Sequence, residues 1–309
     1  MIAYLLRKFI FALIALFIVA TLTFVLMKAI PGDPFRQEQA IPKEIYESLL
    51  SHYGLNKPWS AQYVTYIKQL LTFDFGPSFI HKGRTVRDII AESLPISMLL
   101  GTEALALAIP LGILLGTISA LKHNGWQDGA ASLLAVIGIS IPSFILATLL
   151  QYVLAIKLNW LPIARWGTFS QTILPALSLA ALPTAFITRL TRSKMIEELR
   201  QDYIKTARAK GLPEYIVIAK HALRNTLIPI MSYLGQLAAN IMTGSFIVEK
   251  IFSIPGLGYW FVMSVLNRDY TVIMGITIFY CALLLCTVFI VDFICLLIDP
   301  RIAHATIKK

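Results

Sequence analysis

Residues 202–215 read DYIKTARAKGLPEY, a charged segment interrupted by Gly211 and Pro213. The segment lies between two of the most apolar stretches of a 309-residue chain in which 57% of the residues are hydrophobic and 14% are charged. A mean hydropathy of +0.72 places the chain outside the range of soluble globular proteins. The sequence therefore predicts an integral membrane protein that holds residues 202–215 in one of its aqueous loops.

Six apolar stretches are long enough, or nearly long enough, to cross a bilayer as helices, which takes about 20 residues each. They cover residues 9–30, 96–121, 130–156, 172–188, 226–248 and 272–298. The first stretch is followed by PGDPF rather than by a cleavage site, so we expect a retained helix and not a signal peptide. Proline removes a backbone hydrogen bond, and kinks are expected at Pro110, Pro142, Pro175, Pro183 and Pro229. The predicted fold is all-α, with six transmembrane helices.

The basic residues predict how these helices are oriented, because Lys and Arg collect in cytoplasmic loops. With the N-terminus inside, residues 189–225 are cytoplasmic and the short loops 157–171 and 249–271 are external. Each external loop holds two basic residues, whereas the cytoplasmic loop holds nine: Arg189, Arg192, Lys194, Arg200, Lys205, Arg208, Lys210, Lys220 and Arg224. Both termini are therefore expected in the cytoplasm. The net charge of +10 is explained by this loop and gives no reason to expect a nucleic-acid partner.

Residues 31–95 form a long external segment that we expect to be ordered. Apolar residues recur at helical spacing in 42–53 and 60–71, with Ser60 as the expected N-cap of the second helix. A further helix is expected after Thr85, and the Gly and Pro of DFGPSF predict a turn before it. The segment is predicted to offer a docking surface, and the alternative is a solvated loop that covers the helix ends.

The charged segment itself has the pattern of a short amphipathic helix. Its apolar face consists of Leu199, Tyr203, Ile204 and Ala207. The opposite, basic face consists of Arg200, Lys205, Arg208 and Lys210. Gly211, followed by Leu and Pro, is expected to end the helix with a positive φ. Such a helix either lies on anionic lipid or inserts into a groove on a partner protein. The small residues Ala207, Ala209 and Gly211 favour the groove, because they permit close backbone approach.

A polar stripe runs along the fifth apolar stretch. Ser232, Gln236 and Asn240 recur every four residues on one helical face, and Thr243 lies close beside them. In lipid, such side chains turn toward the interior of the bundle or toward a wet cavity. They are candidates for lining a translocation pathway, and hydrogen bonding between helices is the alternative.

Nine short motifs are specific through their order and spacing. They are PGDPF (31–35), DFGPSF (74–79), LPISMLLG (94–101), IPSF (141–144), DYIKTARAKGL (202–212), HALRNTLIP (221–229), PGLG (255–258), NRDY (267–270) and IDPRI (298–302). Through these motifs the chain resembles, over essentially its whole length, a permease subunit of an ATP-binding-cassette importer. The resemblance is greatest to the B-type subunit of the oligopeptide/dipeptide class.

This resemblance implies the type I importer permease fold, with both termini inside. Residues 1–30 would be the first transmembrane helix, 31–95 the external segment, and 96–309 the permease core with five helices. Residues 189–225 would form the EAA loop, whose coupling helix docks on an ATPase subunit. The positions that match the coupling motif are Asp202, Tyr203, Thr206, Ala207, Arg208, Ala209, Lys210, Gly211 and Leu212, with Thr206 where the family has an acidic residue.

The resemblance also implies the partners of the chain. They are a second homologous permease subunit, two ATP-binding-cassette ATPase subunits, an extracytoplasmic peptide-binding protein and the lipid of a bacterial inner membrane, which the chain would cross several times. Because the chain has no G-x-x-x-x-G-K-[ST] phosphate loop, ATP hydrolysis is expected in the partner subunits, and no enzymatic activity is expected here.

The sequence also allows other functions to be considered. The five histidines and three cysteines are not at ligand spacing, so no catalytic, cofactor or metal site is expected. A nickel importer permease is the alternative within the family, although DFGPSF, TARAKGLP and NRDY favour peptide cargo. A stand-alone secondary transporter is a further alternative, in which Glu103 and Asp292 would couple transport to ions.

Overall fold

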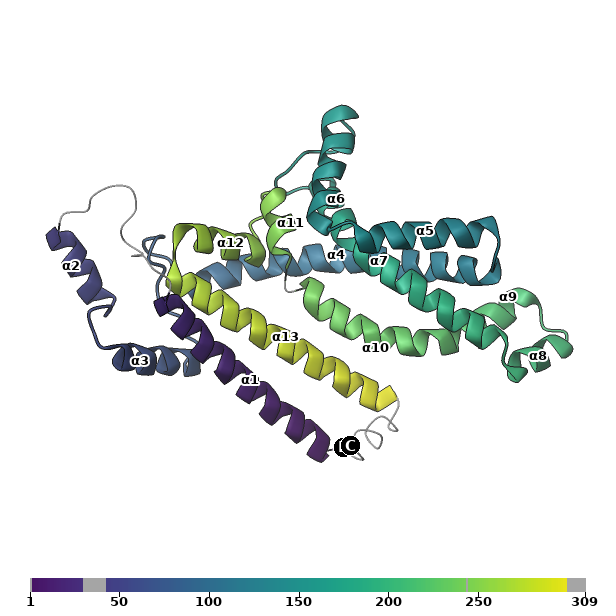
Figure 1. The fold of residues 1–309 in the computed structure, drawn as a ribbon, viewed down its shortest axis with the longest axis horizontal. Helices are drawn as coiled ribbons and strands as arrows, with labels where there is room; N and C mark the ends of the chain where they lie inside the picture. The colour runs from purple at the N-terminus through teal and green to yellow at the C-terminus, as the bar shows by residue number, and fades with distance from the viewer. Residues whose placement is uncertain (1, 30–42, 243, 299–309) are drawn as a thin grey trace.

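The computed structural model describes residues 2–29, 43–242 and 244–298, and these residues are mainly helical (Figure 1). Five long helices form the body of the molecule: α1 (Ile2–Ala29), α4 (Val86–Leu121), α7 (Phe169–Leu199), α10 (Leu223–Met242) and α13 (Tyr270–Ile298). The shorter elements are α2 (Lys43–His52), α3 (Trp59–Leu71), α5 (Trp126–Ser140), α6 (Ser143–Leu150), η1 (Gln151–Lys157), α8 (Asp202–Ala209), α9 (Glu214–Ile216), η2 (Val217–Ala222), α11 (Phe246–Ile251) and α12 (Leu257–Asn267).

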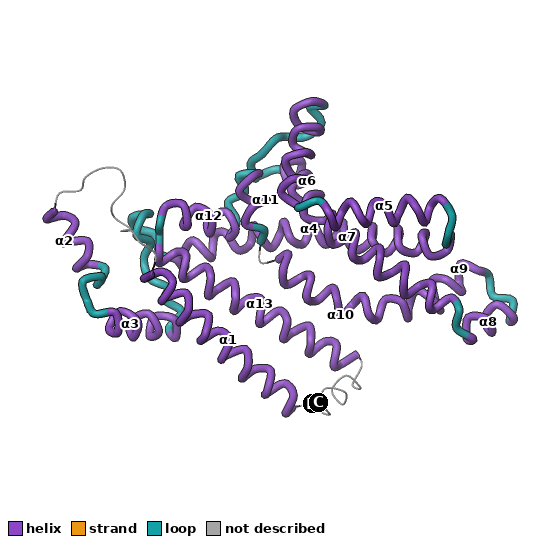
Figure 2. Tube along the Cα trace, in the orientation of Figure 1, coloured by secondary structure: helices purple, strands orange, loops and turns teal. Residues whose placement is uncertain are grey.

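The centre of the fold is the pair α4 and α7, which pack against each other along much of their length (Figure 2). Small residues allow the two backbones to approach closely. A Cβ atom on Gly112 would lie 2.7 Å from the Ile187 side chain, and one on Gly116 would lie 2.5 Å from Thr191. α10 packs against both helices and against α13, which in turn packs against α1.

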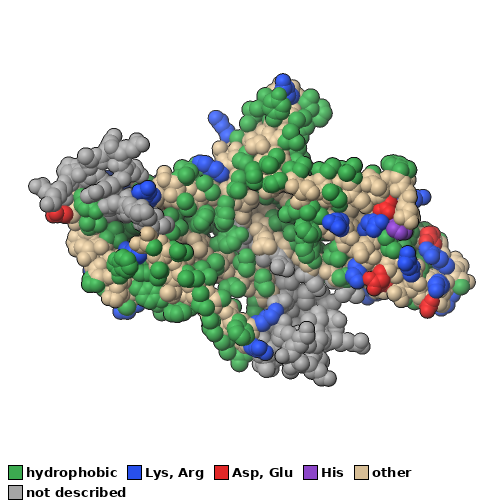
Figure 3. Space-filling view, in the orientation of Figure 1, with side chains coloured by type: hydrophobic (Ala, Val, Ile, Leu, Met, Phe, Trp, Pro, Cys, Tyr) green, Lys and Arg blue, Asp and Glu red, His purple; other side chains and the backbone are tan. Residues whose placement is uncertain are grey.

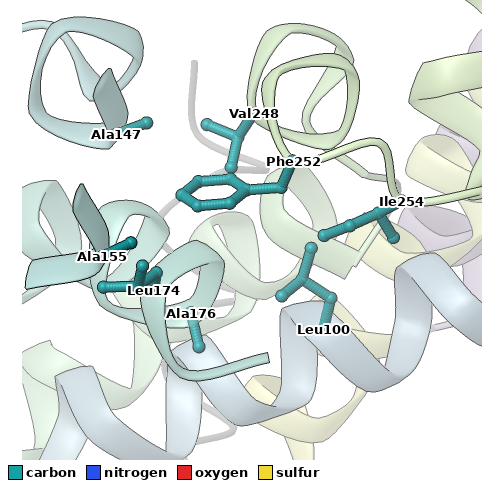
Figure 4. Close-up of a cluster of buried hydrophobic side chains, with 8 residues drawn as sticks. All are labelled: Leu100, Ala147, Ala155, Leu174, Ala176, Val248, Phe252 and Ile254. Carbon is teal, nitrogen blue, oxygen red and sulfur yellow. The ribbon is translucent and has the colours of Figure 1, made fainter. Parts of the chain in front are cut away.

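An apolar cluster fixes α11 against this central pair (Figure 4). It joins side chains from α4, α6, η1, α7 and the end of α11: Leu100, Ala147, Ala155, Leu174, Ala176, Val248, Phe252 and Ile254. Phe252 is among the largest fully buried side chains of the described residues. Burial of apolar area on this scale is the main force that holds such a short helix in place.

A buried carboxylate ties α11 and α12 to α4. Glu249 is fully buried and accepts hydrogen bonds from Ser97 Oγ (2.8 Å) and from the Tyr259 amide (3.1 Å). Ser97 Oγ in turn accepts a hydrogen bond from the Leu257 amide (2.9 Å). Leu257 and Tyr259 lie in the first turn of α12, whose amides have no partner within the helix. Glu249 and Ser97 therefore cap α12 from outside it. Burial raises the pKa of Glu249 to about 7.

Among the described residues, four helices are long and apolar enough to cross a membrane: α1, α4, α7 and α13. α5 and the continuous α6–η1 helix add a fifth candidate as a pair, but the pair is bent by 105°. The bend lies at Ile141, which is extended (φ −87°, ψ 119°), as expected before Pro142. The predicted count of six spans and their orientation stay a prediction.

The other prolines do not break their helices. α4 continues through Pro95 and Pro110, and α7 continues through Pro175 and Pro183. The close packing of α4 on α7 keeps both chains helical despite the lost backbone hydrogen bonds. α10 likewise continues through Pro229. Kinks within these continuous helices stay a prediction.

Several predicted boundaries also differ from the structure. α4 begins at Val86 after the N-cap Thr85, so the expected boundary between residues 95 and 96 lies inside one helix. α7 begins at Phe169 and continues about three turns beyond the C-terminal end of the predicted stretch 172–188. The predicted stretch 226–248 is divided between α10 and α11. Ser60 lies inside α3, whose N-cap is Pro58.

The two segments singled out in the sequence lie at opposite ends of the molecule, with α2 and α3 at one end and α8 and α9 at the other (Figure 1). Both helices predicted in residues 42–53 and 60–71 are present as α2 and α3. Charged side chains gather over the α8 end, whereas hydrophobic side chains cover much of the middle of the visible face (Figure 3). This distribution is expected of a helical bundle embedded in lipid.

Candidate functional site at the α8 end of the bundle

The charged segment folds as a helix–turn unit. α7 ends at Leu199 and α8 begins at Asp202, so the amphipathic helix is shorter than the predicted range. Asp202 lies in its first turn and Arg208 in its last, where the helix dipole favours these charges. Gly211 has φ +76°, which confirms the predicted left-handed residue, and its amide donates to the Arg208 carbonyl (2.9 Å). Pro213 then prevents the helix from continuing.

The inner face of α8 is buried in the protein itself. Ile204 is fully buried and Ala207 is 5% exposed. They belong to a cluster with residues from the ends of α4 and α7 and from η2: Ala120, Met195, Val217 and Ala222. An eight-residue helix has little stability alone, so this cluster must hold it in place. The side chain of Ala207 therefore faces the interior of this chain, which agrees with its place on the predicted apolar face.

The outer face of α8 is exposed. Four residues at helical spacing form its outermost stripe, which we call the α8 stripe: Asp202, Lys205, Thr206 and Ala209. The ammonium of Lys205 lies 2.8 Å from the Asp202 carboxylate. Lys210, Gly211 and the half-buried Leu212 continue the surface beyond the helix. The stripe therefore offers a small, polar surface with two small side chains near its C-terminal end.

Two contacts hold the flanks of α8. Arg208 donates to both carboxylate oxygens of Glu214 (3.1 and 2.5 Å), which raises the pKa of Arg208 and lowers that of Glu214. The Tyr203 hydroxyl donates to Glu198 and accepts from the Asn225 amide (2.9 Å). These polar contacts join α8 to α7, α9 and α10, so Arg208 and Tyr203 position the helix as well as contributing to its surface.

A buried carboxylate lies behind this end of the bundle. Asp128, which is 4% exposed, accepts from Arg192 Nε (2.6 Å) and Nη2 (2.8 Å). It also accepts from Ser119 Oγ (2.5 Å) and the Asn124 amide (2.9 Å). The network ties the ends of α4, α5 and α7 together. Arg192 was predicted to lie in a loop, and no role was predicted for Asp128. The signal in the sequence is an acidic residue at the start of an apolar helix.

The predicted pathway residues lie on or after α10, which packs against α4, α7 and α13. Ser232, Gln236 and Asn240 belong to α10, and Asn240 is exposed. Thr243 lies outside the described residues. Glu103 is half-buried on α4, and its Oε2 has no hydrogen-bond partner among the described residues. A pathway along α10 stays a prediction.

Comparison with known proteins identifies the family. Residues 108–304 match the family described as binding-protein-dependent transport system inner membrane component, and residues 1–101 match the N-terminal component of the same systems.

Curated relatives match nearly the whole chain. It is 48% identical to the dipeptide transport system permease protein DppB of Bacillus subtilis, covering 97% of each chain. It is 46% identical to DppB of Lactococcus lactis, covering 98% of this chain and 99% of that protein. It is 43% identical to the oligopeptide transport system permease protein OppB of Salmonella typhimurium, covering 98% of this chain and all of that protein. The chain therefore belongs to the family of inner membrane components of binding-protein-dependent transport systems.

Proposed function

We propose that this chain is the transmembrane permease subunit of an ATP-binding-cassette importer for dipeptides or oligopeptides. It resides in a bacterial inner membrane, where an extracytoplasmic binding protein delivers the peptide and separate ATPase subunits supply the energy. The relatives described above are named as dipeptide and oligopeptide systems, which favours peptide cargo over nickel. A second, homologous permease subunit completes the pathway.

The observation that carries the proposal is the construction of α8. Its inner face is locked into the bundle by Ile204 and Ala207, and its outer face presents the α8 stripe. The inner face of α8 is packed against the bundle and its outer face is exposed. A displacement of α8 by a partner is therefore transmitted to the bundle, because α8 cannot move independently of the side chains that it packs on. The stripe is the surface that we assign to the ATPase groove.

The stripe also indicates how tightly a partner approaches. Thr206 occupies the position where the family has an acidic residue, so contact here does not depend on an ion pair from that position. Ala209 adds almost no side-chain volume, and the partner surface is expected to come close to the backbone there. The exposed side chains of Asp202 and Lys205 pair with each other and leave a locally neutral surface.

The test is a large side chain in the α8 stripe. Ala209→Trp should release the ATPase, because overpacking a tight contact costs about 1–3 kcal/mol, or about 5- to 150-fold in affinity. Ala219→Trp is the matched control, because Ala219 is exposed on the neighbouring η2. Ala207→Trp is unsuitable, since it overpacks the interior of this chain.

The measurement is co-purification of the ATPase subunits with each variant, together with ATP-dependent dipeptide uptake by the reconstituted complex. We expect Ala209→Trp to lose both and Ala219→Trp to keep both. An α8 that lies on lipid instead would gain membrane contact from the tryptophan and keep its ATPase. Retention of ATPase and uptake at wild-type levels in Ala209→Trp would therefore exclude docking through the stripe. ATP-driven uptake of nickel without peptide would overturn the proposed cargo.

A further inference from the structure

The C-terminal end of α1, the N-terminal end of α13 and α3 surround a cavity of about 340 Å³. The cavity lies at the end of the molecule remote from α8 (Figure 1). Its walls come from the last turns of α1, from α2 and α3 with their loops, and from the first turns of α13. This volume is within the range of small-ligand pockets. The cavity is unrelated to the α8 stripe, and nothing in the proposed function uses it.

Two tyrosine hydroxyls in the cavity wall lack partners. Tyr66 is only 9% exposed, and neither its hydroxyl nor that of Tyr270 has a hydrogen-bond partner in the described structure. A buried hydroxyl that gives up its hydrogen bonds to water without replacing them destabilises the fold. Both tyrosines line the cavity, so a group with acceptor oxygens bound there is the partner that these buried hydroxyls reach by turning toward it.

A positive charge lies in the same wall. Lys28 Nζ contacts Gln62 Oε1 and lies 5.8 Å from the centroid of the Phe24 ring. None of the ion pairs between described residues includes Lys28. Among the described residues of the wall, the one carboxylate is that of Asp74, which is exposed and accepts a hydrogen bond from the Gly76 amide (3.1 Å). The charge and the two hydroxyls together suit an oxyanion.

The surroundings of the cavity identify where that oxyanion comes from. Lys28 and Tyr270 stand at the ends of α1 and α13, which are both apolar enough to span a membrane, so the cavity lies at the depth of the lipid headgroups. The neighbouring surface is apolar although exposed: Trp59 is 65% exposed, Leu71 77% and Phe73 75%. Exposed aromatic and aliphatic side chains around a basic pocket are typical of contact with lipid.

We propose that this cavity binds the phosphate of an anionic phospholipid in the leaflet at the α3 end of the bundle. Lys28 pairs with the phosphate, and the hydroxyls of Tyr66 and Tyr270, which are closed to solvent in the structure, turn toward the phosphate and donate hydrogen bonds to it. The acyl chains follow the exposed apolar face of α1 below Lys28, which includes Leu22, Val25 and Leu26. The lipid thereby joins α3 to the two helices that flank it.

The experiment measures lipid binding by the full-length protein in detergent, by native mass spectrometry and by the shift in thermal unfolding on adding lipid. The probes are phosphatidylglycerol, zwitterionic phosphatidylcholine and inorganic phosphate. We expect one tightly held phosphatidylglycerol, about tenfold weaker binding in Lys28→Gln, and a severalfold loss in Tyr66→Phe and Tyr270→Phe. Lys68→Gln is the matched control, because Lys68 is exposed on α3 and does not line the cavity.

The phenylalanine variants separate binding from folding. Removal of an unpaired buried hydroxyl should leave the unfolding temperature without lipid unchanged or raise it, and should reduce only the shift that phosphatidylglycerol causes. The proposal is overturned if Lys28→Gln and Lys68→Gln bind phosphatidylglycerol equally well. It is also overturned if phosphatidylcholine binds as tightly as phosphatidylglycerol, which removes the role of charge, or if inorganic phosphate does so, which makes the cavity a site for a soluble anion.

Discussion

Substitution of Ile204 by Ala tests whether packing within the chain holds α8 in place. Ile204 is fully buried among side chains from α4, α7 and η2. Truncation of a fully buried isoleucine costs about 2–5 kcal/mol, because the transfer free energy of the lost methyl groups adds to that of the cavity left behind. The neighbours come from three separate elements and cannot all collapse onto the cavity, so we take about 3 kcal/mol.

The loss of this free energy mainly shifts the equilibrium between docked and undocked α8. The helix has eight residues, so the loss falls on the few contacts that hold it rather than on the whole bundle. A loss of about 3 kcal/mol raises the population of undocked α8 about 150-fold. The assay is amide hydrogen exchange over residues 204–212 in the purified protein, combined with transport and ATP hydrolysis in the reconstituted complex.

The expected result is about 150-fold faster exchange in α8, unchanged exchange in α1 and α13, and ATP hydrolysis that no longer drives uptake. Tyr215→Ala is the control, because Tyr215 is 71% exposed on the adjacent turn. If α8 exchanges at the wild-type rate in Ile204→Ala, packing of Ile204 does not hold α8 in place, and a rigid inner face of α8 is refuted.

Three further predictions concern the polar contacts and the turn. Asp128→Asn should lower the free energy of unfolding by about 2 kcal/mol, since the half-buried Arg192 loses its carboxylate partner, whereas Asp202→Asn, with a side chain that is 93% exposed, should change the unfolding midpoint little. Burial raises the pKa of Glu249 from 4.5 to about 7 in the folded state. Glu249 therefore contributes stability that is fully present below pH 4.5 and is lost as the pH rises to about 7. The unfolding temperature should fall across this pH range in the wild type and should not show this fall in Glu249→Gln. Gly211→Ala should destabilise by about 1 kcal/mol through its positive φ alone, because no atom within 4 Å crowds the added Cβ; chemical denaturation measures this, and a neutral result would contradict it.

Local signals in the sequence were sufficient to predict the elements that depend on their own residues. The apolar stretches, the helices α2 and α3 and the positive φ of Gly211 each follow from a pattern within a few residues, and the structure contains them. The family followed from motifs spread over the chain, because their order constrains the sequence more than any single motif does.

Features that depend on contacts between distant elements could not be predicted in this way. The helical pattern places Ala207 on the apolar face, but only the packing of η2 and α7 shows that this face is covered by the chain itself and not by a partner. Glu249 and Ser97 are 152 residues apart in the chain and share one hydrogen bond. Pro110 and Pro142 both lie within apolar stretches, yet the helix breaks only before Pro142, whereas α4 continues through Pro110 while packed on α7.

These long-range contacts converge on α4. Ala120, near one end of the helix, lies in the cluster that supports α8, and Ser119 beside it binds Asp128. Ser97, nearer the other end, binds Glu249 and so holds α11 and α12. About 35 Å of continuous helix separates the two groups. Between the two groups α4 is unbroken and packed on α7, so a displacement imposed at α8 acts on α11 and α12 through one continuous helix. Loss of the Ser119–Asp128 contact or of the Ser97–Glu249 contact would uncouple one end of α4 from the elements that it holds.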